Sequence, residues 1–268
     1  MKKRCFYYFA GILLIAGCIG LPAARAQDTS AAPSTTTPIQ HVVVIFGENI
    51  SFDHYFGTYP HALNPPNEPT FVPDQNTPTI NGLTTTLLKR NPNFFNVAVN
   101  GKDATNPFRL DRSQAATSDE SHAYTPEQRA FHAGLMDSFP RYTGRQGSPA
   151  VQKRLGSMKM AAPPQYAFQT KGLVMGYYDG NTVTALWNYA QRYALNDNSY
   201  GTTFGPSTPG AINLISGQNN GVTDQINAGN SIIPGGDGTF TNISDPSPIG
   251  DVCSTTTGAQ AQLTGNNI

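Results

Sequence analysis

The sequence predicts an α/β fold in which a mostly parallel sheet carries helices on both faces and long loops are inserted between the elements. Three observations predict it. Residues 42–46 form a short apolar run without alternation, as in a strand that is buried on both faces. Helix signals follow at three places further along the chain. The 268 residues include 26 Gly and 21 Pro, and only 13% are charged, which is typical of a loop-rich protein.

The first 26 residues have the three parts of a secretory signal peptide. A basic region at residues 2–4 precedes an apolar region at residues 6–19, which is too short to span a bilayer comfortably, and residues 24–26 (Ala-Arg-Ala) form a cleavage site. Cleavage there leaves a mature chain that begins at Gln27. The sequence therefore predicts a secreted or periplasmic protein without a stable transmembrane segment. Lipid attachment at Cys18 is the alternative.

Removal of the signal peptide changes the charge balance. The whole chain has 17 basic and 17 acidic residues, and the four basic residues of the signal peptide leave without any acidic one. A mildly acidic mature chain gives no support for nucleic-acid binding. Of the three cysteines only Cys253 lies outside the signal peptide, so it either pairs outside this chain or stays a free thiol.

The first elements of the mature chain are a flexible leader and a strand. Residues 27–38 are rich in Ser, Thr and Pro and predict the leader. The strand at residues 42–46 ends at Gly47, and Glu48 and Asn49 follow at once. In open α/β sheets the ligand site lies outside the carboxyl ends of the strands. Glu48 and Asn49 therefore either supply two oxygen ligands for a hard cation or only form a polar turn after the strand.

The middle of the chain predicts a loop, an ambiguous segment and a helix. Residues 60–79 are rich in Pro and Asn and predict a long surface loop, whereas residues 83–99 could supply one or two short strands. Thr125 is suited to cap a helix, with Gln128 completing a capping box, and this helix is expected to end near Asp137.

The later elements are predicted in the same way. Residues 181–193 predict a helix whose apolar face includes Trp187, and residues 194–200 predict a short strand. Thr208 is suited to cap a further helix that runs toward Gly217, and after that glycine the chain shows little periodicity and predicts loops.

Ser207 stands just before that last predicted helix. Unpaired amide donors and the helix dipole gather at a helix N-terminus, which suits a phosphate group. A serine hydroxyl there could attack phosphorus if a bound metal lowers its pKa, giving a phosphoseryl intermediate. The alternative is a Pro-rich turn that happens to contain a serine.

Three ordered segments resemble one known family. Glu48-Asn-Ile-Ser-Phe-Asp-His-Tyr-Phe-Gly57 resembles the opening motif of the bacterial phosphoesterases that include phospholipase C and the secreted acid phosphatases, with Ile50 where Arg is usual. The resemblance implies that Glu48 and Asn49 approach the metal centre. Asp53 and His54 also match the motif, and we interpret them as structural residues that brace the turn.

The other two segments carry further implied roles. Gly-Pro-Ser207-Thr-Pro-Gly210 is similar to the nucleophile motif of these enzymes and places Ser207 on the nucleophile, with Gly210 where Asn is usual. The segment from Asp119 to His122 is similar to another motif and implies that His122 binds the phosphate or protonates the leaving group. Departures at His132 and Leu135 replace the usual Asn and Lys.

The resemblance also implies an alkaline-phosphatase-like fold and a divalent metal ion, with zinc and calcium as candidates. The implied substrate is a phosphate ester, either a phospholipid, as for phospholipase C, or a phosphomonoester, as for acid phosphatase. The family completes its metal site with Asp and His residues from its second half, whereas this chain has no histidine after His132. Residues 39–268 are therefore expected to be the N-terminal portion of a catalytic domain, truncated. The alternative is a non-catalytic exported remnant or binding protein. The late acidic residues are the first to test as further ligands: Asp224, Asp237, Asp245 and Asp251.

Overall fold

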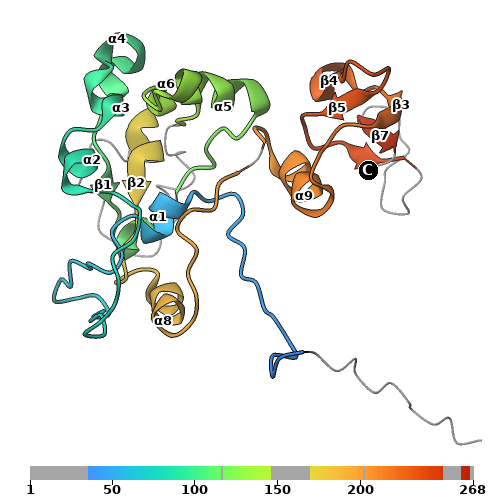
Figure 1. Cartoon of the computed structure of the whole chain (residues 1–268). Coiled ribbons are helices and arrows are strands. Elements are labelled where there is room, and N and C mark those ends of the chain that lie inside the picture. Colours follow the sequence, from blue (N-terminus) through green and yellow to red (C-terminus); the bar gives the residue numbers. More distant parts are fainter. Residues whose placement is uncertain (1–35, 116, 146–169, 202, 250–260, 266–268) are drawn as a thin grey trace, which may run out of the picture. The chain divides into compact units, whose positions relative to one another are not determined.

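The computed structural model describes residues 36–115, 117–145, 170–201, 203–249 and 261–265. The signal peptide, Asp251 and Cys253 lie outside these residues. The chain divides into two units, Met1–Ile45 and Phe46–Ile268, and every described helix and strand belongs to the second (Figure 1). The helices are α1 (Phe52–Phe56), α2 (Thr85–Lys89), α3 (Pro92–Phe95), α4 (Val97–Asn100), α5 (Tyr124–Phe131), α6 (Phe139–Tyr142), α8 (Thr184–Arg192) and α9 (Ser207–Ser216). The 3₁₀ turns are η1 (Gly101–Asp103), η2 (Arg112–Gln114), η3 (His132–Gly134), η5 (Lys171–Met175) and η6 (Gly229–Ser231).

The mixed α/β class is confirmed, because two small sheets accompany these helices. The strands are β1 (Phe108–Arg109), β2 (Gly176–Tyr177), β3 (Val222–Ile226), β4 (Ile232–Pro234), β5 (Phe240–Asn242), β6 (Ser247–Pro248) and β7 (Gln262–Gly265). Strands β1 and β2 pair in parallel and form a two-stranded sheet. The other sheet has the order β4-β5-β3-β7-β6, and its strands lie side by side in Figure 1.

The expectation of a mostly parallel, alkaline-phosphatase-like sheet is not met by the described residues. In the five-stranded sheet, three of the four pairings are antiparallel and only β6 and β7 run in parallel. The connection between β4 and β5 gives the physical reason. Gly236 and Gly238 have φ of +90° and +89° and make a tight turn, which can join antiparallel strands, whereas parallel strands need a long crossover. Residues after Gly217 were predicted as loops, and this part of the prediction is wrong.

The predicted strand at residues 42–46 is also wrong. These residues form no helix or strand, and Val42 and Val43 are 79% and 86% exposed. An apolar run becomes a buried strand only where neighbouring strands accept its backbone hydrogen bonds. Among the described strands, β1 and β2 pair with each other and β3 to β7 pair among themselves, so residues 42–46 gain no such neighbour.

The segment at residues 83–99 is helical rather than extended. It contains α2, α3 and α4, each only one turn long. Thr84 caps α2 by accepting a hydrogen bond from the amide of Leu87, and Asn91 caps α3 by accepting one from Asn93. Short polar side chains at these positions satisfy amides that a helix start leaves unpaired, and these caps outweigh the weak strand pattern.

Helix α5 begins close to the predicted position but ends early. It starts at Tyr124, after Ala123 instead of Thr125, and the Ala123 side chain makes no capping hydrogen bond. It ends at Phe131 because His132 adopts the left-handed conformation with φ of +47°. The expected extension to Asp137 therefore fails, since a left-handed residue cannot continue a right-handed helix.

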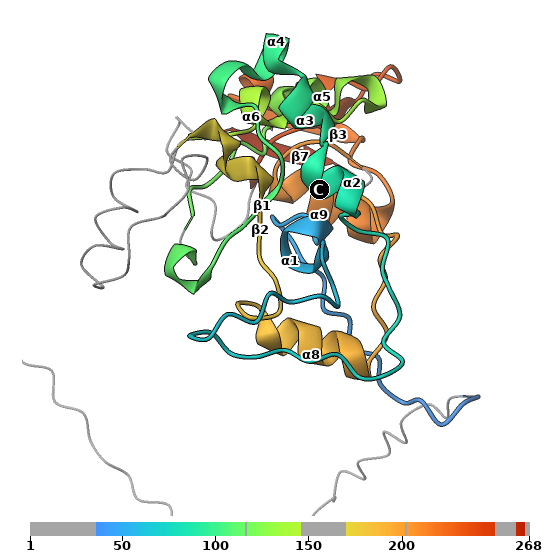
Figure 2. The same cartoon turned by 90° about the vertical axis from the view of Figure 1, so that its left-hand side faces the viewer.

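Helix α8 confirms the prediction that Trp187 lies on a buried face. Trp187 is fully buried and packs with Tyr59 and Phe71. Figure 2 shows the loop at residues 60–79, which has no helix or strand as predicted, running beside α8. The predicted strand at residues 194–200 does not form; these residues are bends and coil.

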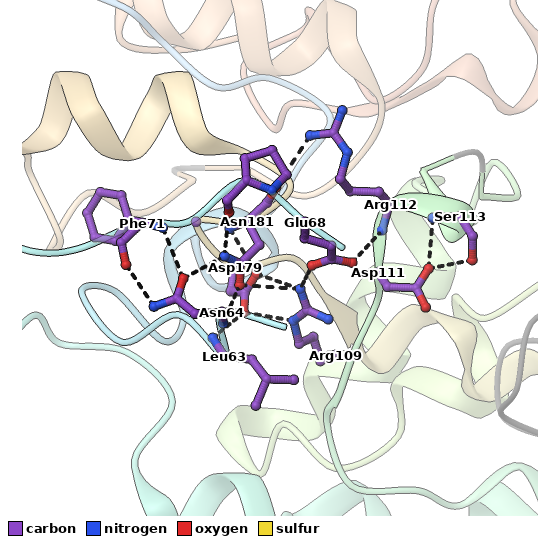
Figure 3. Close-up of polar contacts among 12 residues, drawn as sticks. Leu63, Asn64, Glu68, Phe71, Arg109, Asp111, Arg112, Ser113, Asp179 and Asn181 are labelled. Atoms are coloured by element: carbon purple, nitrogen blue, oxygen red, sulfur yellow. Dashed lines mark hydrogen bonds and ion pairs between the residues drawn. The ribbon is translucent and has the colours of Figure 1, made fainter. Parts of the chain in front are cut away.

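A buried polar network joins the loop at residues 60–79 to β1 and β2 (Figure 3). Arg109 pairs with Glu68, and its Nε donates to Oδ2 of Asp179 over 2.7 Å. Asn181 also belongs to this network, because its side-chain amide donates to Oδ1 of Asn64 over 2.7 Å. These contacts hold a long loop without regular structure against the first sheet.

Candidate active site

The site is built around a contact between two segments that are 159 positions apart in the sequence. Ser207 Oγ donates a hydrogen bond to Oε1 of Glu48 over 2.5 Å. A hydroxyl that donates to a carboxylate makes a short, charge-assisted bond. The structure therefore brings together two of the residues that the sequence assigns to the site.

The start of α9 positions Ser207. Ser207 is the first residue of this ten-residue helix, and Pro206 occupies the N-cap position in an extended conformation. The helix thus begins one residue before the predicted cap, Thr208. A proline side chain cannot accept hydrogen bonds, so the first amides of α9 need partners from elsewhere. The Thr208 amide finds one in Oδ1 of Asp245, over 2.8 Å.

Asn49 adopts a backbone conformation that suits its residue type. Its φ is +60°, in the left-handed region that Asn tolerates better than most residues. Asn49 and Glu48 are both exposed, just before the start of α1. Ser51 caps α1 by accepting a hydrogen bond from the amide of His54, over 3.3 Å. The Glu48-Asn49 pair is thus presented to solvent at a helix start.

His54 and Asp53 lie on α1 and point into the fold. His54 Nδ1 lies 2.7 Å from the carbonyl oxygen of Gly176, and the His54 ring packs edge-on against Tyr178 with ring centroids 5.0 Å apart. Burial lowers the pKa of His54, although the bond to the Gly176 carbonyl works in the opposite direction. A neutral imidazole that donates from Nδ1 to this carbonyl fits the structural role expected for His54.

His122 lines a cavity beside the start of α9. The cavity has a volume of about 270 Å³, and Pro206 forms part of its wall. Among the described residues, Nδ1 of His122 is buried and has no hydrogen-bond partner. The remaining lining residues come from the start of α5, from η6 and from the segments around residues 145 and 245: Ala123, Tyr124, Thr125, Pro126, Arg145, Asn230, Ile243, Ser244 and Asp245.

Contacts between α5 and the segment before α9 explain why His122 lies near Ser207. The amide of Gly205 donates to Oε2 of Glu127 over 2.7 Å, and Phe204 packs against Tyr124 and Phe131. Since His122 immediately precedes α5, these contacts bring it to the same end of α9. Among the described residues, no hydrogen bond joins the side chains of His122 and Ser207.

Sequence reasoning did not assign roles to Arg145, Glu127 or Asp245 at this position. Asp245 was noted only as one of several late acidic residues in a stretch without periodicity. The signal that could have found it is the missing cap at Pro206, because an uncapped helix start needs an acceptor from another segment. Which segment supplies that acceptor depends on the tertiary fold.

The side chains of Glu48, Asn49 and Ser207 each carry oxygen atoms of the kind that bind metal ions. Carboxylate, amide and hydroxyl oxygens suit a hard cation such as calcium, which takes six to eight of them. The described residues contain no group of three or more His, Cys, Asp or Glu side chains placed to hold a metal ion. Glu48 and Asn49 could therefore supply only part of the ligand set of such a cation.

Comparison with known proteins agrees with this arrangement. The model of the Phosphoesterase family matches residues 39–258. Phospholipase C A from Mycobacterium tuberculosis is 25% identical over 201 residues, which are 71% of this chain and 36% of that protein. Phospholipase C B from the same organism is 26% identical over 149 residues, 52% of this chain and 26% of that protein.

The family match covers most of the chain and includes Glu48, Asn49, His122 and Ser207. The chain spans only about a third of the length of the first of these relatives. Because the family match covers most of its length, the chain belongs to the phosphoesterase family.

Proposed function

We propose that this chain is part of an exported, metal-dependent phosphoesterase in which Ser207 is the nucleophile. The observation that carries the proposal is the hydrogen bond from Ser207 Oγ to Glu48, at the N-terminus of a helix. It places a hydroxyl beside a carboxylate where helix amides and the helix dipole favour a phosphate group.

Glu48 and Asn49 are the residues that would hold the metal ion. When bound, such an ion lowers the pKa of a nearby hydroxyl and offsets the charge of the phosphate. Glu48 orients the Ser207 hydroxyl by accepting its proton in a hydrogen bond. Ser207 Oγ then attacks phosphorus and its proton passes to Glu48, while the bond to the leaving-group oxygen breaks and a phosphoserine forms. Water would then attack this phosphoserine, releasing phosphate or its ester and restoring the Ser207 hydroxyl.

The role proposed for His122 is to protonate the leaving group or to bind the phosphate. Its ring lines the cavity that adjoins the start of α9, and its buried Nδ1 is not engaged by any described residue. A protonated imidazole there would donate to the departing oxygen or to a phosphate oxygen. The relatives are named as phospholipases C, so the proposed substrates are phosphate esters that include phospholipids, with phosphomonoesters as the alternative.

Export is proposed from the N-terminal segment. The basic, apolar and Ala-Arg-Ala parts of residues 1–26 predict cleavage before Gln27. Among the described residues, no helix is both long and apolar enough to cross a membrane. The intact mass of the exported protein tests this proposal: a product that keeps residues 1–26 would contradict it, and a lipid on Cys18 would replace a free protein with an anchored one.

The function is tested with two substitutions and one matched control. Ser207→Ala should reduce hydrolysis of phosphatidylcholine or 4-nitrophenyl phosphate by about a thousandfold or more, because removal of a nucleophile costs several orders of magnitude. It should leave calcium or zinc binding, measured by calorimetry, unchanged. Glu48→Ala should lose metal binding and hydrolysis together.

Ser216→Ala is the control, since Ser216 lies at the other end of α9 and donates to the carbonyl of Ile212. It should keep both properties. Hydrolysis by Ser207→Ala at close to the wild-type rate would show that another group attacks phosphorus. The two substrates, assayed side by side, separate phospholipase C activity from acid phosphatase activity.

A further inference from the structure

The Asp245 carboxylate accepts a hydrogen bond from one of the backbone amides at the start of α9. Its Oδ1 accepts a hydrogen bond from the backbone amide of Thr208 over 2.8 Å, and Thr208 is the residue after Ser207. The amides of the first helical turn are the donors that a phosphate group on Ser207 would use. The Asp245 carboxylate therefore lies at the start of α9, bonded to the amide of the residue that follows Ser207.

The same carboxylate faces the cavity beside α9. Asp245 lines the cavity of about 270 Å³ together with His122 and Arg145. This volume is at the small end of ligand pockets and suits a phosphate group with a short substituent. Pro206, the residue before Ser207, also lines the cavity, so the cavity provides space for an anion at the start of α9, with the Asp245 carboxylate in its wall.

Arg145 supplies the opposite charge. Its side chain lines the same cavity, and none of the ion pairs in the described part of the chain involves it. Arg145 and Asp245 thus put one positive and one negative side chain among the residues that line the cavity. Asp245 repels each negative charge of a bound anion, so it opposes a dianion more than a monoanion.

We propose that the Asp245 carboxylate weakens the binding of dianionic phosphomonoesters to this site more than the binding of monoanionic phosphodiesters. The inference rests on the proposed function, in which Ser207 attacks the phosphate. A phosphomonoester carries about two negative charges above its second pKa, near 6, and a phosphodiester carries one. At about 4 Å, even in the dielectric of water, one added unit of charge changes an affinity about fivefold.

Binding of two simple anions at pH 8 tests the preference without requiring turnover. Inorganic phosphate serves as the dianion and dimethyl phosphate as the monoanion, and calorimetry gives a Kd for each. Asp245→Asn removes the charge but keeps an oxygen that can accept from the Thr208 amide. The ratio of the phosphate Kd to the dimethyl phosphate Kd should fall about fivefold.

Two further variants sharpen this test. Asp74→Asn removes an exposed carboxylate in the loop at residues 60–79 that does not line the cavity, so its Kd ratio should match the wild type. Arg145→Met removes the positive charge, and its ratio should rise about fivefold. Arg192→Met, on α8, is its control and should leave the ratio unchanged.

The proposal is overturned if Asp245→Asn leaves the ratio unchanged or raises it, or if the wild-type protein binds neither anion. It is also overturned if Asp245→Asn loses metal binding, because Asp245 would then be a metal ligand. Hydrolysis of 4-nitrophenyl phosphate, a monoester, and of bis(4-nitrophenyl) phosphate, a diester, tests the role of Ser207 separately from that of Asp245. Continued hydrolysis by Ser207→Ala contradicts the proposed function, whereas an unchanged diester-to-monoester ratio in Asp245→Asn contradicts only the charge preference.

Discussion

Glu120 is a buried carboxyl that lies two residues before His122. Its Oε2 accepts a hydrogen bond from the backbone amide of Arg145, and its Oε1 is buried without a hydrogen-bond partner among the described residues. Burial raises the pKa of Glu120 to about 8 from its usual value of 4.5, against the smaller opposing effect of the Arg145 amide. The side chain is therefore protonated in the folded protein at neutral pH.

This raised pKa makes stability depend on pH. Between about 4.5 and about 8 the folded protein holds a proton that the unfolded chain has released, so the free energy of unfolding falls as pH rises through this range. Glu120→Gln should reduce that fall by at least about 1 kcal/mol, since one pKa unit corresponds to about 1.4 kcal/mol. Urea denaturation at pH 5 and pH 8 measures it.

Asp224→Asn, which removes an exposed carboxylate, is the control for this measurement and should keep the wild-type pH dependence. If Glu120→Gln and the wild type lose the same stability between the two pH values, Glu120 is not the buried acid that the structure indicates.

The fully buried side chain of helix α8 is that of Trp187. The Trp187 ring meets Tyr59 and Phe71 edge-on, with ring centroids 5.2 and 5.0 Å apart. Its Nε1 donates to the carbonyl oxygen of Tyr55 over 2.7 Å. The helix therefore connects the loop at residues 60–79 with α1, whose start lies beside Glu48.

Trp187→Ala should lower the free energy of unfolding by about 3–5 kcal/mol, because it removes a fully buried ring and leaves a cavity. Tyr189→Ala on the same helix is the matched control, because Tyr189 is 50% exposed, and it should cost much less. Urea denaturation followed by circular dichroism provides both values. A similar loss in the two variants would mean that α8 is not anchored by its buried face.

The molecule as a whole depends on contacts between segments that are distant in the sequence. Arg109 on β1 pairs with Glu68 in the loop at residues 60–79 and with Asp179, just after β2. The Asp179 side chain is only 2% exposed. It also accepts a hydrogen bond from the amide of Leu63 over 2.9 Å, so one network joins three parts of the chain.

Arg109→Met should lower the free energy of unfolding by about 3–5 kcal/mol, because it leaves two buried carboxylates without their cation. Arg192→Met removes an exposed cation from α8 and should change stability by less than about 1 kcal/mol. Denaturation of the two variants under the same conditions measures the difference. Equal stability of Arg109→Met and the wild type would show that the network does not hold the loop.

Much of the local structure follows from the sequence. The buried face of α8 follows from apolar spacing, and the start of α9 follows, to within two residues, from the Ser-Thr-Pro segment. The absence of helix and strand at residues 60–79 follows from their Pro and Asn content. Each of these depends on residues within one or two turns of one another, which a linear pattern records.

Sequence patterns failed where an element depends on distant neighbours. Residues 42–46 have the composition of a buried strand, yet no described strand lies alongside to accept their hydrogen bonds. The strands after Gly217 have little periodicity, and they form because the glycine turn between β4 and β5 lets them pair. Strand pairing is a non-local property, so local composition cannot decide it.

The sequence by itself determined the family of this protein and the residues that carry its motifs, because those motifs are short and continuous: Glu48, Asn49, His122 and Ser207. Only the tertiary structure decided that Ser207 contacts Glu48 and that Asp245 accepts a hydrogen bond from the Thr208 amide. The physical reason is that these contacts join segments whose separation in space is set by packing between elements, which no single stretch of sequence encodes.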